Sequence, residues 1–123
     1  MLDSFLIHSF QSPVARLDDL LRNHRFSVPT DKIVAVKIDT ERLEGQVLVG
    51  SRALLALQKP LILAEAGHCN SLVCTELLPL GSLYARRTGR QLETTTAPVN
   101  SVNGFFLHPI HSAEYRRIGL LKP

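Results

Sequence analysis

The sequence predicts a single α/β domain, and three features of its middle third support this prediction. Residues 33–39 form a short apolar run that ends in an acid, and residues 59–65 form a second such run. Between them lies an amphipathic segment, residues 40–58, which is long enough to connect two parallel strands. Short runs rich in Val and Ile suit strands that are buried on both faces of a sheet. Residues 33–65 are therefore expected to form a βαβ unit.

Size and composition agree with one domain over residues 1–123. The chain is 45% hydrophobic and 20% charged, and no shift in composition divides it. No apolar run reaches the roughly 18 residues that a membrane-spanning helix needs. The first ten residues lack the basic start and small-residue cleavage site of a signal peptide. We therefore expect a soluble, cytoplasmic protein with no membrane partner.

The segment before the first strand is expected to be a helix over residues 14–24, or at least over residues 17–24. Its apolar residues, at 14, 17, 20 and 21, fall on one helical face. Ser12-Pro13 is a good helix start, and the helix should end before Pro29 because the residue preceding a proline is pushed out of the helical region.

The crossover segment allows two interpretations. As a helix, it has acids near its start that complement the helix dipole, and an apolar stripe made of Leu43, Val47, Leu54 and Leu55. As an alternative, residues 46–50 could form a second strand in a hairpin with residues 33–39, since glycines at 45 and 50 weaken a helix.

The last third is expected to contain a helix and a hairpin. Residues 66–72 suggest a loop, and residues 73–87 a helix broken at Pro79 and Gly81. Residues 91–96 and 104–110 have β character and predict a C-terminal antiparallel hairpin. The tail could add a short helix whose Ile118, Leu120 and Leu121 dock on the body.

The pattern of residues 37–65 resembles the FkbM-type S-adenosylmethionine-dependent methyltransferases. That family has a KIDVEG-like strand end, a helix with a VL-x-G element, and a strand that begins with Lys-Pro and ends in Glu. The LDDLL segment at residues 17–21 resembles the one that precedes this strand in the family, and the resemblance favours the helical crossover. The matching residues are Lys37, Ile38, Asp39, Thr40, Glu41, Glu44, Val47, Leu48, Gly50, Leu54, Leu55, Lys59, Pro60 and Glu65.

The resemblance covers residues 14–66, and residues 67–123 are compatible with it. It implies a partial Rossmann-like class I methyltransferase fold, with a mostly parallel sheet and a C-terminal antiparallel hairpin, that holds strands four to seven of seven. Two departures stand out. The seven glycines form no G-x-G motif, so the glycine-rich cofactor turn is missing. Arg42 stands where the family usually has the glycine of KIDVEG, where it could fill or recharge space near the substrate or cofactor.

The candidate site residues are implied by the resemblance. Asp39 and Glu41 are the candidate catalytic residues, and Asp39 is also the candidate cofactor ligand. Lys37, Glu44 and Glu65 are the candidate substrate-binding residues, with Lys37 orienting the acids and Glu44 supporting the helix start. Strand ends fit such a site, because ligands of open α/β sheets bind outside the carboxyl ends of the strands.

A purely structural role for the same acids is the alternative. Asp39 or Thr40 could cap the crossover helix, while Glu41 and Glu44 complement its dipole. An acid at position 39 could equally serve as the base that removes a proton from a methyl acceptor.

Three functions follow from these residues. The first is an S-adenosylmethionine-dependent methyltransferase, short or truncated, that O-methylates a small molecule or sugar. The second is a non-catalytic half-domain that acts through homo-oligomerisation or a partner chain supplying the missing strands, because an uncovered edge strand invites pairing. The third is a small basic nucleic-acid-binding module, which the modest net charge of +3 hardly favours.

Metal and disulfide chemistry find little support. The histidines and cysteines do not have zinc-site spacing, so no metal is predicted. Two cysteines five positions apart are expected to be reduced core residues. An arginine cluster near Tyr84 could grip a phosphate, but a basic helix end also suits the helix dipole. These residues are His68, Cys69, Cys74, His108, His111, Arg86, Arg87 and Arg90.

Overall fold

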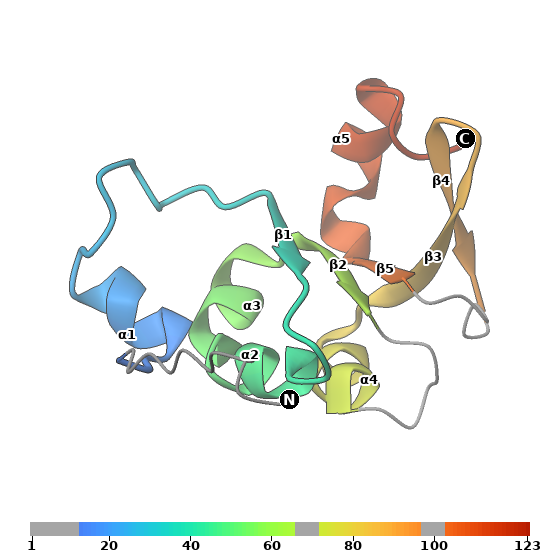
Figure 1. The fold of residues 1–123 in the computed structure, drawn as a ribbon. Helices are drawn as coiled ribbons and strands as arrows, with labels where there is room; N and C mark the ends of the chain where they lie inside the picture. Colours follow the sequence, from blue (N-terminus) through green and yellow to red (C-terminus); the bar gives the residue numbers. More distant parts are fainter. Residues whose placement is uncertain (1–12, 66–71, 97–102) are drawn as a thin grey trace, which may run out of the picture.

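The computed structural model describes residues 13–65, 72–96 and 103–123, and places helices on both sides of one sheet (Figure 1). Among these residues, no helix is long and apolar enough to cross a membrane. The elements, in chain order, are α1 (Leu17–Arg22), β1 (Ala35–Ile38), α2 (Glu44–Val49), α3 (Arg52–Gln58), β2 (Leu61–Glu65), α4 (Leu72–Leu77), the 3-10 helix η2 (Leu78–Leu80), β3 (Leu83–Thr88), β4 (Gln91–Thr95), β5 (Asn103–Leu107), the 3-10 helix η3 (Pro109–His111) and α5 (Ser112–Arg117).

The five described strands form one mixed sheet in the order β1-β2-β5-β3-β4. β1 and β2 are parallel, with Ala35 opposite Leu61 and Ile38 opposite Ala64, which confirms the βαβ unit. The β2–β5, β5–β3 and β3–β4 pairs are antiparallel, so the expectation of a mostly parallel sheet is wrong. Two antiparallel steps separate β2 from β3, and β3 therefore runs in the same direction as β1 and β2.

The last third of the chain departs from the prediction. α4 ends at Leu77, and the segment expected to continue as a helix instead becomes strand β3. Pro79 lies in η2, and Gly81 follows it with φ +90°, a conformation that favours glycine and turns the chain into the strand. Gly89, at φ +64°, then begins the tight turn between β3 and β4.

The hairpin predicted between residues 91–96 and 104–110 does not form. β4 pairs with β3, whereas β5 lies between β2 and β3 and makes no pair with β4. Thr88-Gly89 reads locally as a helix end, yet the register of Thr88 opposite Gln91 makes it a hairpin turn. The β3–β4 pair is thus a local hairpin, whereas the β2–β5 and β3–β5 pairs join segments that are distant in the chain, which local patterns cannot reveal.

Each face of the sheet carries its own apolar core. On one face, Ile62 and Phe106 pack with residues of α2, α3 and α4, including Leu48, Leu55 and Leu77. The expected core role is confirmed for Cys74, which is buried and whose sulfur accepts a hydrogen bond from the Tyr84 hydroxyl, while Cys69 lies outside the described residues.

The second core lies under α5, on the opposite side of the sheet in Figure 1. Leu107, Ala85, Leu92 and Tyr115 belong to it. The tail adds Leu121, which is buried and forms a parallel bridge with Leu92. The docking predicted for the tail is thus confirmed for Leu121, and also for Leu120, which is partly buried and packs against the same core.

Ile118 does not share this role. Its side chain is 58% exposed, because α5 ends at Arg117 and the following turn leaves Ile118 outside the second core.

The crossover is helical, so the hairpin alternative for residues 46–50 is wrong, but it consists of two helices. α2 stops at Gly50, and Ser51 Oγ donates to the Val47 carbonyl at 2.6 Å where the chain turns into α3. A Cβ on Gly45 would lie 2.5 Å from Leu72 Cβ, so a glycine is needed for α2 to pack against α4. Gly45, one of the two glycines that weaken the helix prediction, therefore serves close packing. The apolar stripe is only partly buried, since Leu43 is 55% exposed.

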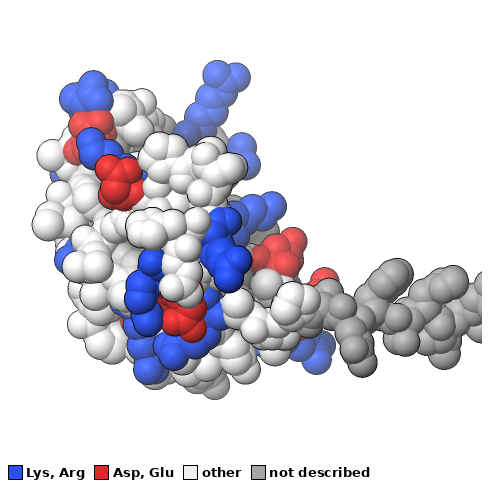
Figure 2. All heavy atoms as spheres, turned by 90° about the vertical axis from the view of Figure 1, so that its left-hand side faces the viewer, with Lys and Arg blue, Asp and Glu red and all other residues white. Residues whose placement is uncertain are grey.

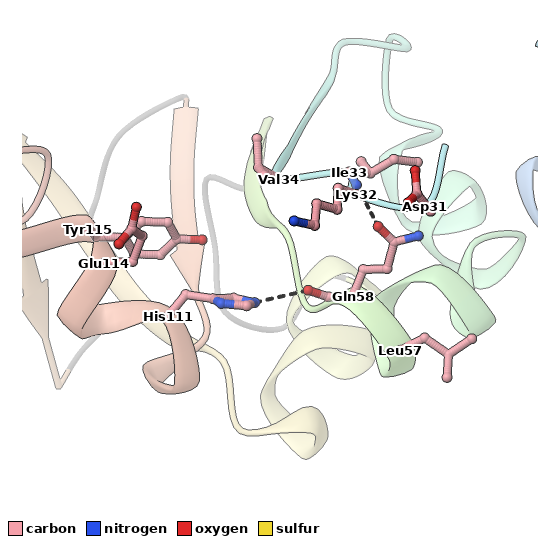
Figure 3. A pocket seen from close by; sticks show the side chains of 9 residues that line it. All are labelled: Asp31, Lys32, Ile33, Val34, Leu57, Gln58, His111, Glu114 and Tyr115. Atoms are coloured by element: carbon pink, nitrogen blue, oxygen red, sulfur yellow. Dashed lines mark hydrogen bonds between the residues drawn. The ribbon is translucent and has the colours of Figure 1, made fainter. Parts of the chain in front are cut away.

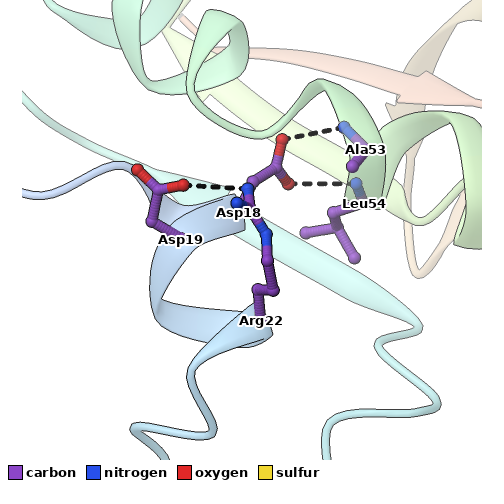
Figure 4. Close-up of polar contacts among 5 residues, drawn as sticks. All are labelled: Asp18, Asp19, Arg22, Ala53 and Leu54. Atoms are coloured by element: carbon purple, nitrogen blue, oxygen red, sulfur yellow. Dashed lines mark hydrogen bonds and ion pairs between the residues drawn. The ribbon is translucent and has the colours of Figure 1, made fainter.

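Asp18 joins α1 to the start of α3. Its two carboxylate oxygens accept hydrogen bonds from Ala53 N–H at 2.8 Å and Leu54 N–H at 3.1 Å (Figure 4). Ser51, the N-cap residue of α3, makes no side-chain capping bond of its own. Asp18 therefore satisfies N–H groups at the start of a helix that begins more than thirty residues later in the chain, where a negative charge also suits the helix dipole.

Replacing Asp18 with Ala should lower the free energy of unfolding by about 1–2 kcal/mol, because two N–H groups at the start of α3 lose a charged acceptor. Urea unfolding followed by circular dichroism measures this change. Asp19→Ala is the matched control, since the interaction of the Asp19 side chain with the described residues is an exposed pair with Arg22, and its loss should cost less than about 0.5 kcal/mol. Equal losses in the two variants would contradict the capping role.

Candidate functional site

The candidate residues Asp39 and Glu65 lie at the same edge of the sheet. Ile38 is opposite Ala64 in the parallel β1–β2 pair, so the next residue of each chain segment stands at the carboxyl end of its strand. Glu65 ends β2 there, with its backbone paired to Asn103 of β5. The structure thus brings these two positions together in backbone register.

Lys37 and Asp39 are both exposed at this edge. The side chain of Lys37 lies on the face of β1 opposite to buried Ile38, as the alternation of a strand requires. Within the described ranges, no ion pair joins Asp39 to a basic side chain, so Lys37 does not hold the acids in place here. The carboxylate of Asp39 is open to solvent.

The turn between β1 and α2 has an uncommon backbone. Glu41 has φ +51° and Arg42 has φ +76°, both in the left-handed region that side chains with a Cβ rarely adopt. Both side chains are exposed. Position 42, which matches the glycine of the KIDVEG pattern, therefore has the conformation that glycine adopts most readily.

Glu44 is buried, with 4% of its surface exposed, and holds this turn together. The Thr40 N–H donates to its carboxylate at 3.1 Å. Burial raises the pKa of the Glu44 carboxyl, but hydrogen bonds from the N–H groups of Glu44, Thr40 and Arg42 and from the Thr40 side chain bring that pKa below its usual range. The carboxylate is thus ionised and engaged with the backbone that leads into α2, in agreement with its expected support of the helix start.

The structural alternative for the other acids is not supported. The N-cap residue of α2 is Leu43, with no side-chain capping bond, so neither Asp39 nor Thr40 caps that helix. Glu44 is the acid in the first turn of α2, whereas Glu41 lies before it in the turn. Asp39 consequently has no structural task among the interactions of the described residues.

The other constellations considered from the sequence serve structural contacts. His108 Nε2 lies 2.9 Å from the Leu80 carbonyl, and His111 Nε2 lies 3.0 Å from the Gln58 carbonyl, so each imidazole is bonded to the backbone. His68 and Cys69 lie outside the described residues.

The arginine cluster is on the β3–β4 hairpin, not at a helix end as the sequence suggested. Arg86 pairs with Glu93 across the hairpin at 3.1 Å, and Arg87 Nε donates to the Gly89 carbonyl. On another face, the one on which α1 lies, Figure 2 shows basic side chains gathered around acidic ones. The two signs are therefore interspersed on that face. On the hairpin, Arg86 and Arg87 have partners within the protein, which disfavours a phosphate site made by all three arginines.

Gln58 is a structural residue that the sequence did not single out. Its side chain accepts from the Ile33 N–H and donates to the Thr30 carbonyl at 3.0 Å. In addition, His111 Nε2 is bonded to the backbone carbonyl of Gln58. Gln58 therefore connects the end of α3 both to residues 30–33 and to η3. No local pattern could have marked it, because its partners lie 25, 28 and 53 positions away.

Comparison with protein-family models, curated proteins and solved structures finds no match.

Replacing Arg42 with Gly should raise the free energy of unfolding by about 0.5–1 kcal/mol, because glycine adopts φ +76° without the steric cost that a Cβ imposes. Arg42→Ala is the matched control: it removes the same charge but keeps the Cβ, and should give no such gain. Urea unfolding of the three proteins measures both. An equal gain in both variants would point to charge rather than backbone conformation.

Replacing Glu44 with Gln should cost about 1–2 kcal/mol of unfolding free energy at pH 7, because backbone N–H groups lose an ionised acceptor. The pKa of Glu44 is lower in the folded state than its unfolded value of about 4.3, so this stabilisation is present above that pH and is lost as pH falls through the folded value. The difference in unfolding free energy between the wild-type protein and Glu44→Gln should therefore become smaller in acid.

Unfolding measured between pH 3 and pH 7 tests this dependence. Glu41→Gln, at an exposed acid of the same turn, is the control and should track the wild-type protein. If the difference in unfolding free energy between the wild-type protein and Glu44→Gln stays constant over this pH range, the stabilising role of the ionised Glu44 carboxylate is contradicted.

Proposed function

We propose that the chain carries part of an S-adenosylmethionine-dependent methyltransferase domain of the FkbM type, acting on a hydroxyl group of a small molecule or sugar. The observation that carries this proposal is the left-handed backbone at Arg42. The resemblance places a glycine at this position, and a turn that demands glycine-like geometry is a physical reason for that glycine. The sequence of this chain, with a long cation there, gave no hint of such a turn.

The position of the acids gives further support. Asp39 follows one parallel strand and Glu65 ends the next, at the edge where ligands of α/β sheets bind. Glu44 holds the intervening turn through the Thr40 N–H, which fixes the chain that follows Asp39. A rigid turn keeps an exposed carboxylate in one place, and this is what a binding or catalytic acid needs.

The chemistry expected of these residues is modest. S-adenosylmethionine supplies an activated methyl group when bound, and the protein then has to align the acceptor oxygen with it. Asp39, exposed and without an ion-pair partner among the described residues, fits the role of hydrogen-bond acceptor for a ribose or substrate hydroxyl. The same carboxylate could take the proton that the hydroxyl loses.

Calorimetric titration of the chain with S-adenosylmethionine tests the proposal. We expect binding at submillimolar cofactor, weakened at least about tenfold in Asp39→Asn, because a hydroxyl donor then loses its charged acceptor. Asp19→Asn is the control, since Asp19 lies on the far surface of α1 in a pair with Arg22, and it should bind as the wild type does. No heat at millimolar cofactor would contradict cofactor binding by this chain.

A second candidate, a half-domain that acts by association, is favoured by the open edge at β1. In the described part of the sheet, β1 has a neighbour only on the β2 side. Val34, just before β1, is 72% exposed, and Leu57 at the end of α3 is 82% exposed. Unpaired strand edges with apolar neighbours promote association. A concentration-dependent dimer in light scattering of a sample that binds no cofactor would favour this function over the first.

A further inference from the structure

A pocket of about 340 Å³ lies at the amino ends of β1 and β2, opposite to the edge that holds Asp39. Three segments line it: residues 31–34 before β1, the end of α3, and residues from η3 to α5 (Figure 3). Its volume falls at the lower end of the range for small-molecule sites. Its apolar residues Val34 and Leu57 are the ones that favour association above, but the methyltransferase function does not use the pocket.

Hydrogen bonds fix the walls of this pocket. The Gln58 side chain holds residues 30–33 from one side, through the Thr30 carbonyl and the Ile33 N–H. On the other side, His111 Nε2 is bonded to the Gln58 carbonyl at 3.0 Å. A carbonyl can only accept, so Nε2 of His111 carries the proton. The pocket is therefore preformed by bonds between segments that are distant in sequence.

The lining combines apolar walls with two donors. Ile33, Val34 and Leu57 contribute aliphatic surface, and the ring of buried Tyr115 forms the far wall. In Figure 3, the Lys32 ammonium and the Tyr115 hydroxyl point toward each other across the pocket. Burial raises the pKa of Tyr115, so its hydroxyl stays protonated and able to donate at neutral pH.

Lys32 is available for a ligand. Among the described residues, no carboxylate lies within ion-pair distance of its ammonium. Glu114, which also lines the pocket, is paired with Arg117, and Asp31 lies on the side of the Gln58 amide in Figure 3. These two acids disfavour a multiply charged anion but leave room for one negative charge between Lys32 and Tyr115.

We propose that this pocket binds a small monocarboxylate with an apolar body of roughly ten non-hydrogen atoms, a size that suits its volume. The carboxylate accepts hydrogen bonds from the Lys32 ammonium and the Tyr115 hydroxyl, and the body packs on Ile33, Val34 and the Tyr115 ring. Charge-assisted bonds in a partly apolar pocket are stronger than in water, which gives the acid an advantage over a neutral analogue.

Titration with 3-phenylpropionate, followed in ¹H–¹⁵N correlation spectra, tests the proposal. We expect shifts concentrated on residues 31–34, Gln58 and residues 111–115, with affinity at least about tenfold above that of 3-phenylpropan-1-ol. Shifts centred on other segments, or equal affinity for the acid and the alcohol, would overturn it.

A variant of Lys32 tests whether its ammonium group binds the carboxylate of the ligand. Lys32→Gln should weaken binding of the acid about tenfold and leave the alcohol unchanged. Lys59→Gln is the matched control, because Lys59 at the end of α3 donates to the Ala56 carbonyl and does not line the pocket. Tyr115→Phe keeps the ring and should weaken the acid several-fold. Equal effects of the two lysine variants on the acid would overturn the proposal.

Discussion

The parallel pairing of β1 with β2 is the constraint on which the rest of the structure depends. Parallel neighbours need a long connection, and residues 39–60 supply it as two helices that cover one face of the sheet. The same pairing places the candidate functional residues at two opposite edges of the sheet. Asp39 and Glu65 lie where the strands end, whereas Lys32 and Gln58 lie beside the pocket where the strands begin.

The helices are held on that face by contacts that depend on small residues and backbone groups. Gly45 allows α2 to approach Leu72 of α4, and Gly50 lies against Arg16 while its carbonyl accepts from the Asp18 N–H at 2.9 Å. Asp18 in turn binds the start of α3. The LDDLL segment at residues 17–21 therefore has two structural roles. Its leucines are partly buried, and Asp18 caps the start of α3.

The turn after β1 combines an unfavourable left-handed backbone at Glu41 and Arg42 with the stabilising, buried carboxylate of Glu44. Left-handed residues persist where the surroundings fix them, and here the Glu44 carboxylate binds N–H groups of the turn itself. This explains how a chain with Arg42 in place of glycine can keep the turn. It also separates the roles of the neighbouring acids, since Glu44 is engaged internally and Asp39 faces solvent.

The sequence alone determined the βαβ unit, the presence of a first helix and the acids at the strand ends, because periodicity and strand ends are local properties of the chain. It left the crossover open between a helix and a hairpin strand, and the structure decided for two helices. Local patterns failed in the last third of the chain, where a strand was mistaken for part of a helix. Residues 83–88 resemble a helix until β5 pairs beside them, and Gly89 resembles a helix end until β4 folds back. The tertiary structure also decided the left-handed turn at Arg42, the cap by Asp18 and the pocket around Gln58. Each of these joins groups whose proximity arises only when the sheet and its helices are assembled.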